Sequence, residues 1–144
     1  MLQLWQLIKQ ETLIKDQFGK EVRRTIFKNP INHQEEEYVL FGQRDLSIVL
    51  PVTKENMVVT VLQFKQGCNK IIHELPAGTA DFTRESPEEV ARRELMEETG
   101  YQSEKVIFLG PPLWMSSRNS WTRVFTFLAL NCEKLRKGKF DEME

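Results

Sequence analysis

Three glutamates at helical spacing are the most informative residues in this sequence. Glu94, Glu97 and Glu98 stand at positions i, i+3 and i+4, so an α-helix would bring their carboxylates to one face, within reach of a common point. Three clustered carboxylates disfavour one another's ionisation and weaken an isolated helix. A hard divalent cation would compensate, because Mg²⁺ binds carboxylate oxygens and keeps its other positions for water and substrate phosphates. The alternative is a solvated acidic helix face.

The residues around these acids favour the cation site, because they resemble the Nudix box, G-x5-E-x7-R-E-U-x-E-E-x-G-U with U aliphatic. Six residues rather than five separate Gly78, which matches the first glycine of the pattern, from Glu85, which matches its first glutamate. Tyr101 stands in the final aliphatic position. The extra residue falls in a loop, where an insertion costs little. The spacing from the first acid to the arginine is kept. The matching positions are Gly78, Glu85, Arg93, Glu94, Leu95, Glu97, Glu98 and Gly100.

This resemblance implies a role for each matched residue. In the Nudix family the glutamates that match Glu94 and Glu98 are the principal Mg²⁺ (or Mn²⁺) ligands. The glutamate that matches Glu97 assists directly or through water, and the main-chain carbonyl at Ala77 often joins them. The metal would bridge pyrophosphate oxygens and activate a water molecule for attack on phosphorus.

The resemblance adds an arginine and two tail glutamates to the catalytic set. Arg93 would orient the acids with Glu85 as its partner, and a surface ion pair is the alternative reading. The acidic tail at 140–144 resembles a loop in which a glutamate acts as base or extra ligand, so Glu142 or Glu144 would take that role. A floppy charged tail is equally compatible, and the chain ends where relatives continue with a strand and helix, as a fragment or a short member would.

The sequence Glu-Leu-Pro-Ala-Gly at 74–78 resembles the branch of the family that hydrolyses ADP-ribose and other nucleotide sugars. Gln-Phe-Lys at 63–65 resembles that branch's Q-Y/F-R strand end. Lys65 would contact a phosphate without the bidentate fork of arginine, or lie in water. We therefore expect hydrolysis of the pyrophosphate bond of a sugar-linked nucleoside diphosphate, giving a nucleoside monophosphate and a sugar phosphate.

The loop at 110–120 is long for a plain connection, and such loops are often functional. Trp114 could stack on a base or sugar, while Ser116, Ser117 and Arg118 could meet phosphates. Packing on the core and exposure to water are the competing interpretations. Trp121 enters a strand and is expected in the core.

Short β-branched and aromatic runs between turn signals predict strands at 23–27, 37–41, 46–52, 57–64, 71–75, 106–109 and 123–130, with a hairpin turn at 54–56. Ser86, Pro87 and Glu89 predict a helix start with a capping box, and Gly100 predicts its end. The fold class is therefore α+β with a mixed sheet, and the resemblance implies a Nudix fold in which helices sandwich that sheet (α/β/α). Residues 1–45 would form extra antiparallel strands that mediate dimerisation, and 46–144 the Nudix core.

The composition of the chain limits the kinds of partner that it is expected to bind. Twenty basic against twenty-one acidic residues leave a net charge of −1, which offers no general attraction to nucleic acid or anionic membranes. Cys68 and Cys132 have no metal-ligand or C-x-x-C spacing, so both are expected to be structural in a reduced cytoplasmic setting. We expect a homodimer that binds a small nucleotide. There are two alternatives. One is a catalytically weak Nudix domain with a binding or regulatory role, and the other is a Nudix enzyme that acts on RNA ends or dinucleoside polyphosphates.

Overall fold

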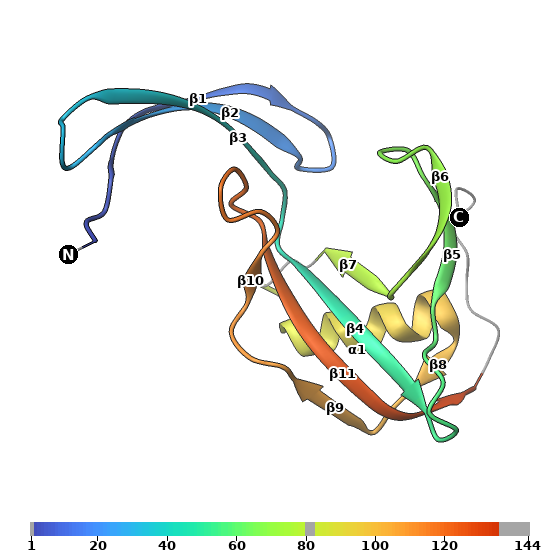
Figure 1. Ribbon diagram of the computed structural model, residues 1–144. Coiled ribbons are helices and arrows are strands. Elements are labelled where there is room, and N and C mark those ends of the chain that lie inside the picture. The colour runs from blue at the N-terminus through green and yellow to red at the C-terminus, as the bar shows by residue number, and fades with distance from the viewer. Residues whose placement is uncertain (1, 80–82, 136–144) are drawn as a thin grey trace. The chain divides into compact units, whose positions relative to one another are not determined.

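The structure is a computed structural model that describes residues 2–79 and 83–135 (Figure 1). The chain divides into two compact units. The N-terminal unit takes in the residues up to 44 together with 114–123, and the helix-bearing unit takes in 45–113 and the residues from 124 onward. In chain order the elements are β1 (Gln6–Lys15), β2 (Glu21–Lys28), β3 (Glu35–Gly42), β4 (Leu46–Thr53), β5 (Val61–Lys65), β6 (Lys70–Glu74), β7 (Ala77–Thr79), α1 (Pro87–Glu94), the π-helical turn η1 (Leu95–Thr99), β8 (Tyr101–Gln102), β9 (Lys105–Phe108), β10 (Leu113–Trp114) and β11 (Arg123–Lys134).

The N-terminal unit contains an antiparallel sheet of β1, β2 and β3. Its first turn is fixed by the Asp16 carboxylate, which accepts hydrogen bonds from the amides of Phe18 and Lys20 at 2.9 and 2.7 Å. Strands at 23–27 and 37–41 were predicted and are present within β2 and β3. The residue pattern did not locate β1, because its apolar residues come in pairs rather than alternating, and its register with β2 shifts twice.

The helix-bearing unit is built on a mixed sheet. β11 pairs in parallel with β4 and antiparallel with β8 and β9, while β4 pairs antiparallel with β7 on its other edge. Alternate residues of β4 are buried, as expected for a strand with one face against a helix. The short strand β7 was not predicted; it pairs with the first residues of β4, at one end of the strand order β10-β11-β4-β7.

Two hairpins lie at the edge of this unit. The predicted turn at 54–56 is present, with the Asn56 amide donating to the Thr53 carbonyl at 3.1 Å and Asn56 in the left-handed region. The strand predicted at 57–64 is shorter than expected, because 57–60 serve as the return of that turn and β5 begins at Val61. β5 and β6 then form a separate two-stranded hairpin.

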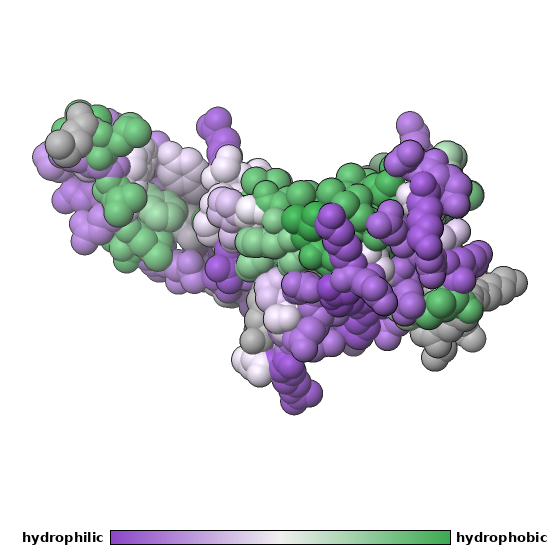
Figure 2. Space-filling view, turned by 90° about the horizontal axis from the view of Figure 1, so that it is seen from below, coloured by the Kyte–Doolittle hydropathy of each residue, from purple (hydrophilic) through white to green (hydrophobic). Residues whose placement is uncertain are grey.

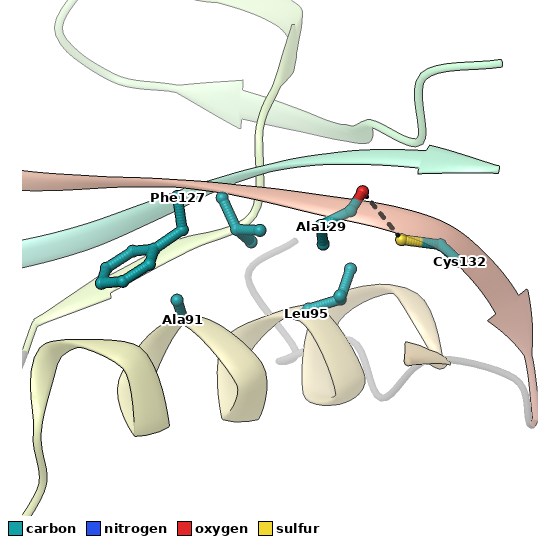
Figure 3. Packing of buried hydrophobic residues seen from close by; sticks show 6 residues of the cluster. Ala91, Leu95, Phe127, Ala129 and Cys132 are labelled. Atoms are coloured by element: carbon teal, nitrogen blue, oxygen red, sulfur yellow. Dashed lines mark hydrogen bonds between the residues drawn. The ribbon is translucent and has the colours of Figure 1, made fainter. Parts of the chain in front are cut away.

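The core of the helix-bearing unit lies between the sheet and the helix. Ala91 and Leu95 pack against Phe127, Ala129 and Cys132 of β11 (Figure 3). The sulfur of Cys132 donates a hydrogen bond to the Ala129 carbonyl at 3.4 Å, and burial raises the pKa of this thiol.

The two cysteines differ in their surroundings. Cys132 is a buried core residue, as expected. Cys68 lies exposed in the turn between β5 and β6, so the prediction of a buried structural role was wrong for Cys68, because a hairpin turn offers no core to enter.

The α+β class with a mixed sheet is confirmed. An α/β/α sandwich implies a helical layer on each face of the sheet. Within residues 2–79 and 83–135 there is one such layer, which consists of α1 and its continuation η1. Seen from below, a broad hydrophobic area lies beside hydrophilic surface (Figure 2). Exposed apolar residues of the helix-bearing unit include Ile107, Leu109 and Leu113. None of the helical segments described is long and apolar enough to cross a membrane.

Candidate functional site

The start of α1 is fixed by the residues that the sequence indicated. The Ser86 hydroxyl accepts from the Glu89 amide at 3.2 Å, and the Glu89 carboxylate accepts from the Ser86 amide at 2.7 Å, which is a complete capping box. These donors lower the pKa of Glu89. The buried Ser47 hydroxyl donates to the Pro87 carbonyl at 2.7 Å, so the capped end is also tied to β4.

The end of the helix departs from the expected α-helical spacing. Residues 95–99 form a π-helical turn, in which hydrogen bonds span five residues instead of four. Gly100 then stops the helix in the left-handed conformation, with φ of 75°, as predicted. A wider turn changes the angle between successive side chains, so Glu97 and Glu98 are not placed relative to Glu94 as they would be on a regular α-helix.

Two of the glutamates lie against β7. The Glu98 carboxylate accepts a hydrogen bond from the Ala77 amide at 3.2 Å. The Glu94 carboxylate packs against Gly78 so closely that a Cβ at this glycine would overlap it. Glu94 is 14% exposed in its side chain. The structure therefore sets two carboxylates beside two consecutive backbone positions, and a side chain at the second position would displace the Glu94 carboxylate.

Arg93 occupies the centre of the acidic cluster. Its Nε and Nη2 atoms donate to the two oxygens of Glu85 at 3.0 and 3.3 Å. Its Nη1 donates to Glu94 at 2.6 Å and to Glu97 at 3.1 Å. The hydrogen bond with Glu85, then those with Glu94 and Glu97, raise the pKa of Arg93. The predicted partnership of Arg93 with Glu85 is present, and Glu97, 49% exposed in its side chain, lies at the rim.

Burial dominates the electrostatics of Glu94. Desolvation raises the pKa of this carboxyl, while Arg93 acts in the opposite direction. A partly buried carboxylate beside further acids is a position where additional positive charge is stabilising. A cation next to Glu94 would therefore offset a penalty that Arg93 alone does not remove.

The donor set fits a hard divalent cation that is only partly held by protein. Within the ranges that the structure describes, no three acidic, histidine or cysteine side chains converge into a closed metal cage. Mg²⁺ does not need one, because it binds through one or two carboxylates and keeps waters and substrate oxygens. Glu94 and Glu98, which contact the adjacent backbone positions Gly78 and Ala77, are the residues that could hold such a cation.

A family model described as NUDIX domain matches residues 42–144. The chain belongs to the Nudix family. The matched range contains the whole box from Gly78 to Gly100, and the box coincides with the cluster formed by α1, η1 and β7.

Three known proteins are similar to this chain. An ADP-ribose pyrophosphatase of Bacillus subtilis (strain 168) is 45% identical over 88 residues, which are 61% of this chain and 40% of that protein. A methanol dehydrogenase activator of Bacillus methanolicus is 43% identical over 61 residues, 42% of this chain and 32% of that protein. A crystal structure described as ADP compounds hydrolase superposes on the whole chain with a TM-score of 0.82 at 20% identity and is covered to 76%. The last likeness confirms the Nudix-like fold. The chain matches less than half the length of either curated relative.

The remaining predicted site residues are less closely grouped. Lys65 forms an ion pair with Glu74 at 2.8 Å across the β5–β6 hairpin, so its charge already has a partner. His73 on β6, which was not a predicted site residue, is exposed and shares a hydrogen bond with the Thr60 hydroxyl at 2.9 Å. Neither contact reaches the Nudix box.

The predicted loop residues belong to the N-terminal unit. Trp114 and Arg118 are exposed, and the Ser116 hydroxyl donates to the Asn119 side chain. Arg118 and Ser117 line a pocket of about 500 Å³ whose other walls are largely aromatic. Trp121 lines it too, half-buried under the Arg23 guanidinium, which lies 4.1 Å from the ring centroid. Glu142 and Glu144 lie outside the described residues.

One residue of the site, Thr99, was not predicted from the sequence. Thr99 occupies the unspecified position of the E-E-x-G pattern, and no spacing rule gave it a role. Its buried hydroxyl donates to the Leu95 carbonyl and accepts from the Tyr101 amide at 3.1 Å. Side-chain hydrogen bonding to a carbonyl four residues earlier is a known habit of threonine in helices, so residue type alone was the available signal.

Proposed function

We propose that this chain hydrolyses the pyrophosphate bond of a nucleoside diphosphate linked to a sugar, of the ADP-ribose type, with Mg²⁺ or Mn²⁺ as cofactor. The observation that carries the proposal is the placement of the Glu94 and Glu98 carboxylates against Gly78 and Ala77. Support for the substrate class comes from the ADP-ribose pyrophosphatase that is 45% identical over the matched region. The products would be a nucleoside monophosphate and a sugar phosphate.

Each residue of the cluster has a part in this proposal. Glu94 and Glu98 would hold the cation, and Glu97 would help through water. Arg93 keeps Glu94 and Glu97 oriented through charge-assisted hydrogen bonds, which are the stronger class. When bound, the metal neutralises charge on the diphosphate and lowers the pKa of a water molecule. The catalytic base would be a tail glutamate, Glu142 or Glu144.

A substrate panel tests the proposal. The chain would be incubated with ADP-ribose, GDP-mannose and UDP-glucose, with Mg²⁺, with Mn²⁺, and with EDTA. We expect release of nucleoside monophosphate that depends on the metal and is abolished by the chelator. Absence of turnover on every substrate with both metals would contradict the proposed activity.

A binding or regulatory role is the second candidate. The relative described as a methanol dehydrogenase activator, 43% identical over 61 residues, favours it. Calorimetric titration distinguishes the two roles, because a regulatory domain would bind a nucleotide sugar with Mg²⁺ present and leave it uncleaved. Product formation at a rate that disappears in Glu98→Gln would favour the enzyme.

We also propose that residues 1–45 mediate a homodimer of a cytoplasmic protein. Support comes from β1, which is exposed at every residue and so leaves one edge of its sheet available for pairing. Sedimentation equilibrium is expected to give twice the chain mass. A monomer at concentrations well above those in the cell would contradict the dimer.

A further inference from the structure

The hydroxyl of Thr99 lies where α1 changes into its final wide turn. It donates to the Leu95 carbonyl and accepts from the Tyr101 amide, so its one donor and one of its two acceptor lone pairs are used. Thr99 is 9% exposed. A hydroxyl in this position links the first residue of η1 to the first residue after Gly100.

These two hydrogen bonds oppose continuation of a regular α-helix. A threonine hydroxyl that takes a carbonyl four residues earlier competes with the backbone amide for that acceptor and bends the helix. Single π-helical turns of this kind occur frequently at functional sites. The Leu95 side chain is at the same time anchored in the core, so the Leu95 carbonyl offers Thr99 a fixed point.

The consequence of the wide turn falls on Glu98, directly before Thr99. In a regular α-helix, Glu97 and Glu98 would lie on either side of Glu94. In the structure the Glu98 carboxylate reaches the Ala77 amide, beside the Glu94 carboxylate at Gly78, whereas Glu97 lies at the rim with Arg93.

We propose that Thr99 is a positioning residue: its hydroxyl maintains the η1 turn that places the Glu98 carboxylate on the Ala77 amide. Thr99 need not touch metal or substrate for this. Its effect on the Glu98–Ala77 contact is independent of the proposed function, and its effect on metal affinity rests on that function. The hydroxyl group, rather than the volume of the side chain, is the part that matters.

Three variants separate these possibilities. Thr99→Val removes the hydroxyl at nearly constant volume, Thr99→Ser retains it, and Ser47→Ala is the matched control. Ser47 is 0% exposed and also donates its hydroxyl to a carbonyl of the helix, but at the opposite end. Both Thr99→Val and Ser47→Ala remove a buried hydroxyl that donates to a helix carbonyl. Thr99→Val also removes the acceptor for the Tyr101 amide, and only this variant affects η1.

Hydrogen exchange of the Ala77 amide is the first measurement. Without any metal, we expect exchange at Ala77 to be about 10-fold faster or more in Thr99→Val, the change that corresponds to loss of about one hydrogen bond. Thr99→Ser and Ser47→Ala should exchange as the wild type does at this amide. Unchanged protection in Thr99→Val, or equal loss in Ser47→Ala, overturns the proposal. If Thr99→Val does not fold, Thr99→Ala takes its place with the same expected and contrary results.

Metal affinity is the second measurement. Mn²⁺ binding followed by electron paramagnetic resonance should weaken by about 10-fold or more in Thr99→Val, the range found when a residue supporting a ligand is removed. Binding should be restored in Thr99→Ser. A wild type that binds no Mn²⁺ and turns over no substrate contradicts the proposed function alone, because the exchange result still decides the role of Thr99. Equal Mn²⁺ affinity in wild type and Thr99→Val contradicts positioning.

Discussion

The two units of this chain differ in how far their sheets are covered by other elements. In the helix-bearing unit, α1 and η1 cover β4 and β11, and Leu95 is only 1% exposed. In the N-terminal unit, β1 is exposed along its whole length, and Leu13 on it is 42% exposed. A sheet covered by its own helix can hold carboxylates at fixed positions, because the helix is anchored by close packing on one side. The comparison explains why the proposed chemistry is concentrated in the helix-bearing unit.

Truncation of a core leucine should give the largest effect. We expect Leu95→Ala to lower the free energy of unfolding by about 2–5 kcal/mol, because it removes buried methyl groups and leaves a cavity. Leu13→Ala in β1 is the matched control and should change the free energy by less than about 0.5 kcal/mol, as surface substitutions do. Urea unfolding followed by circular dichroism measures both. Equal losses would show that β1 is as well packed as the helix.

Removal of one carboxylate charge should spare the fold and abolish the reaction. Glu98→Gln is expected to reduce turnover by more than about 100-fold, the upper end of the losses seen when only a supporting residue of a metal site is changed. The neutral amide is a poor Mg²⁺ ligand. Glu104→Gln, on the loop before β9, is the control and should turn over normally. Wild-type turnover by Glu98→Gln would remove Glu98 from the site.

A single methyl group at Gly78 tests the close contact with β7. The Cβ of Gly78→Ala would overlap the Glu94 carboxylate, so this side chain must move. We expect about 10-fold more Mg²⁺ to be required for half-maximal activity, as for other disturbances around a metal ligand. Gly67→Ala, where nothing lies near the added atom, should leave the Mg²⁺ requirement unchanged. An unaltered requirement in Gly78→Ala would mean that Glu94 does not act from this position.

The smallest effect is expected at the helix start. Ser86→Ala removes the hydroxyl that accepts from the Glu89 amide and should lower the free energy of unfolding by about 1 kcal/mol. Ser117→Ala, at an exposed position of the N-terminal unit, should have no measurable effect. Thermal unfolding measures the stability of both variants. Stability equal to wild type in Ser86→Ala would show that the cap is dispensable.

Local rules predicted the parts of the fold that depend on short sequence segments. The capping box at Ser86, the stop at Gly100 and the turn at 54–56 follow from side-chain chemistry within a few residues. The strand β1 could not be located by alternation, since its register shifts interrupt the pattern. The strand β7 is three residues long and forms because β4 lies next to it, which no local pattern encodes.

The candidate site shows the same division. The sequence by itself determined that Glu94, Glu97 and Glu98 belong to one helical segment with Arg93 and that Glu85 pairs with this arginine, since the spacing and residue types match a family pattern. Tertiary structure alone decided that Glu94 and Glu98 lie at the backbone of β7 while Glu97 lies at the rim. The physical reason is that this placement depends on the packing of Leu95 against β11 and on the position of β7 beside the helix, which are contacts between segments that are distant in the chain.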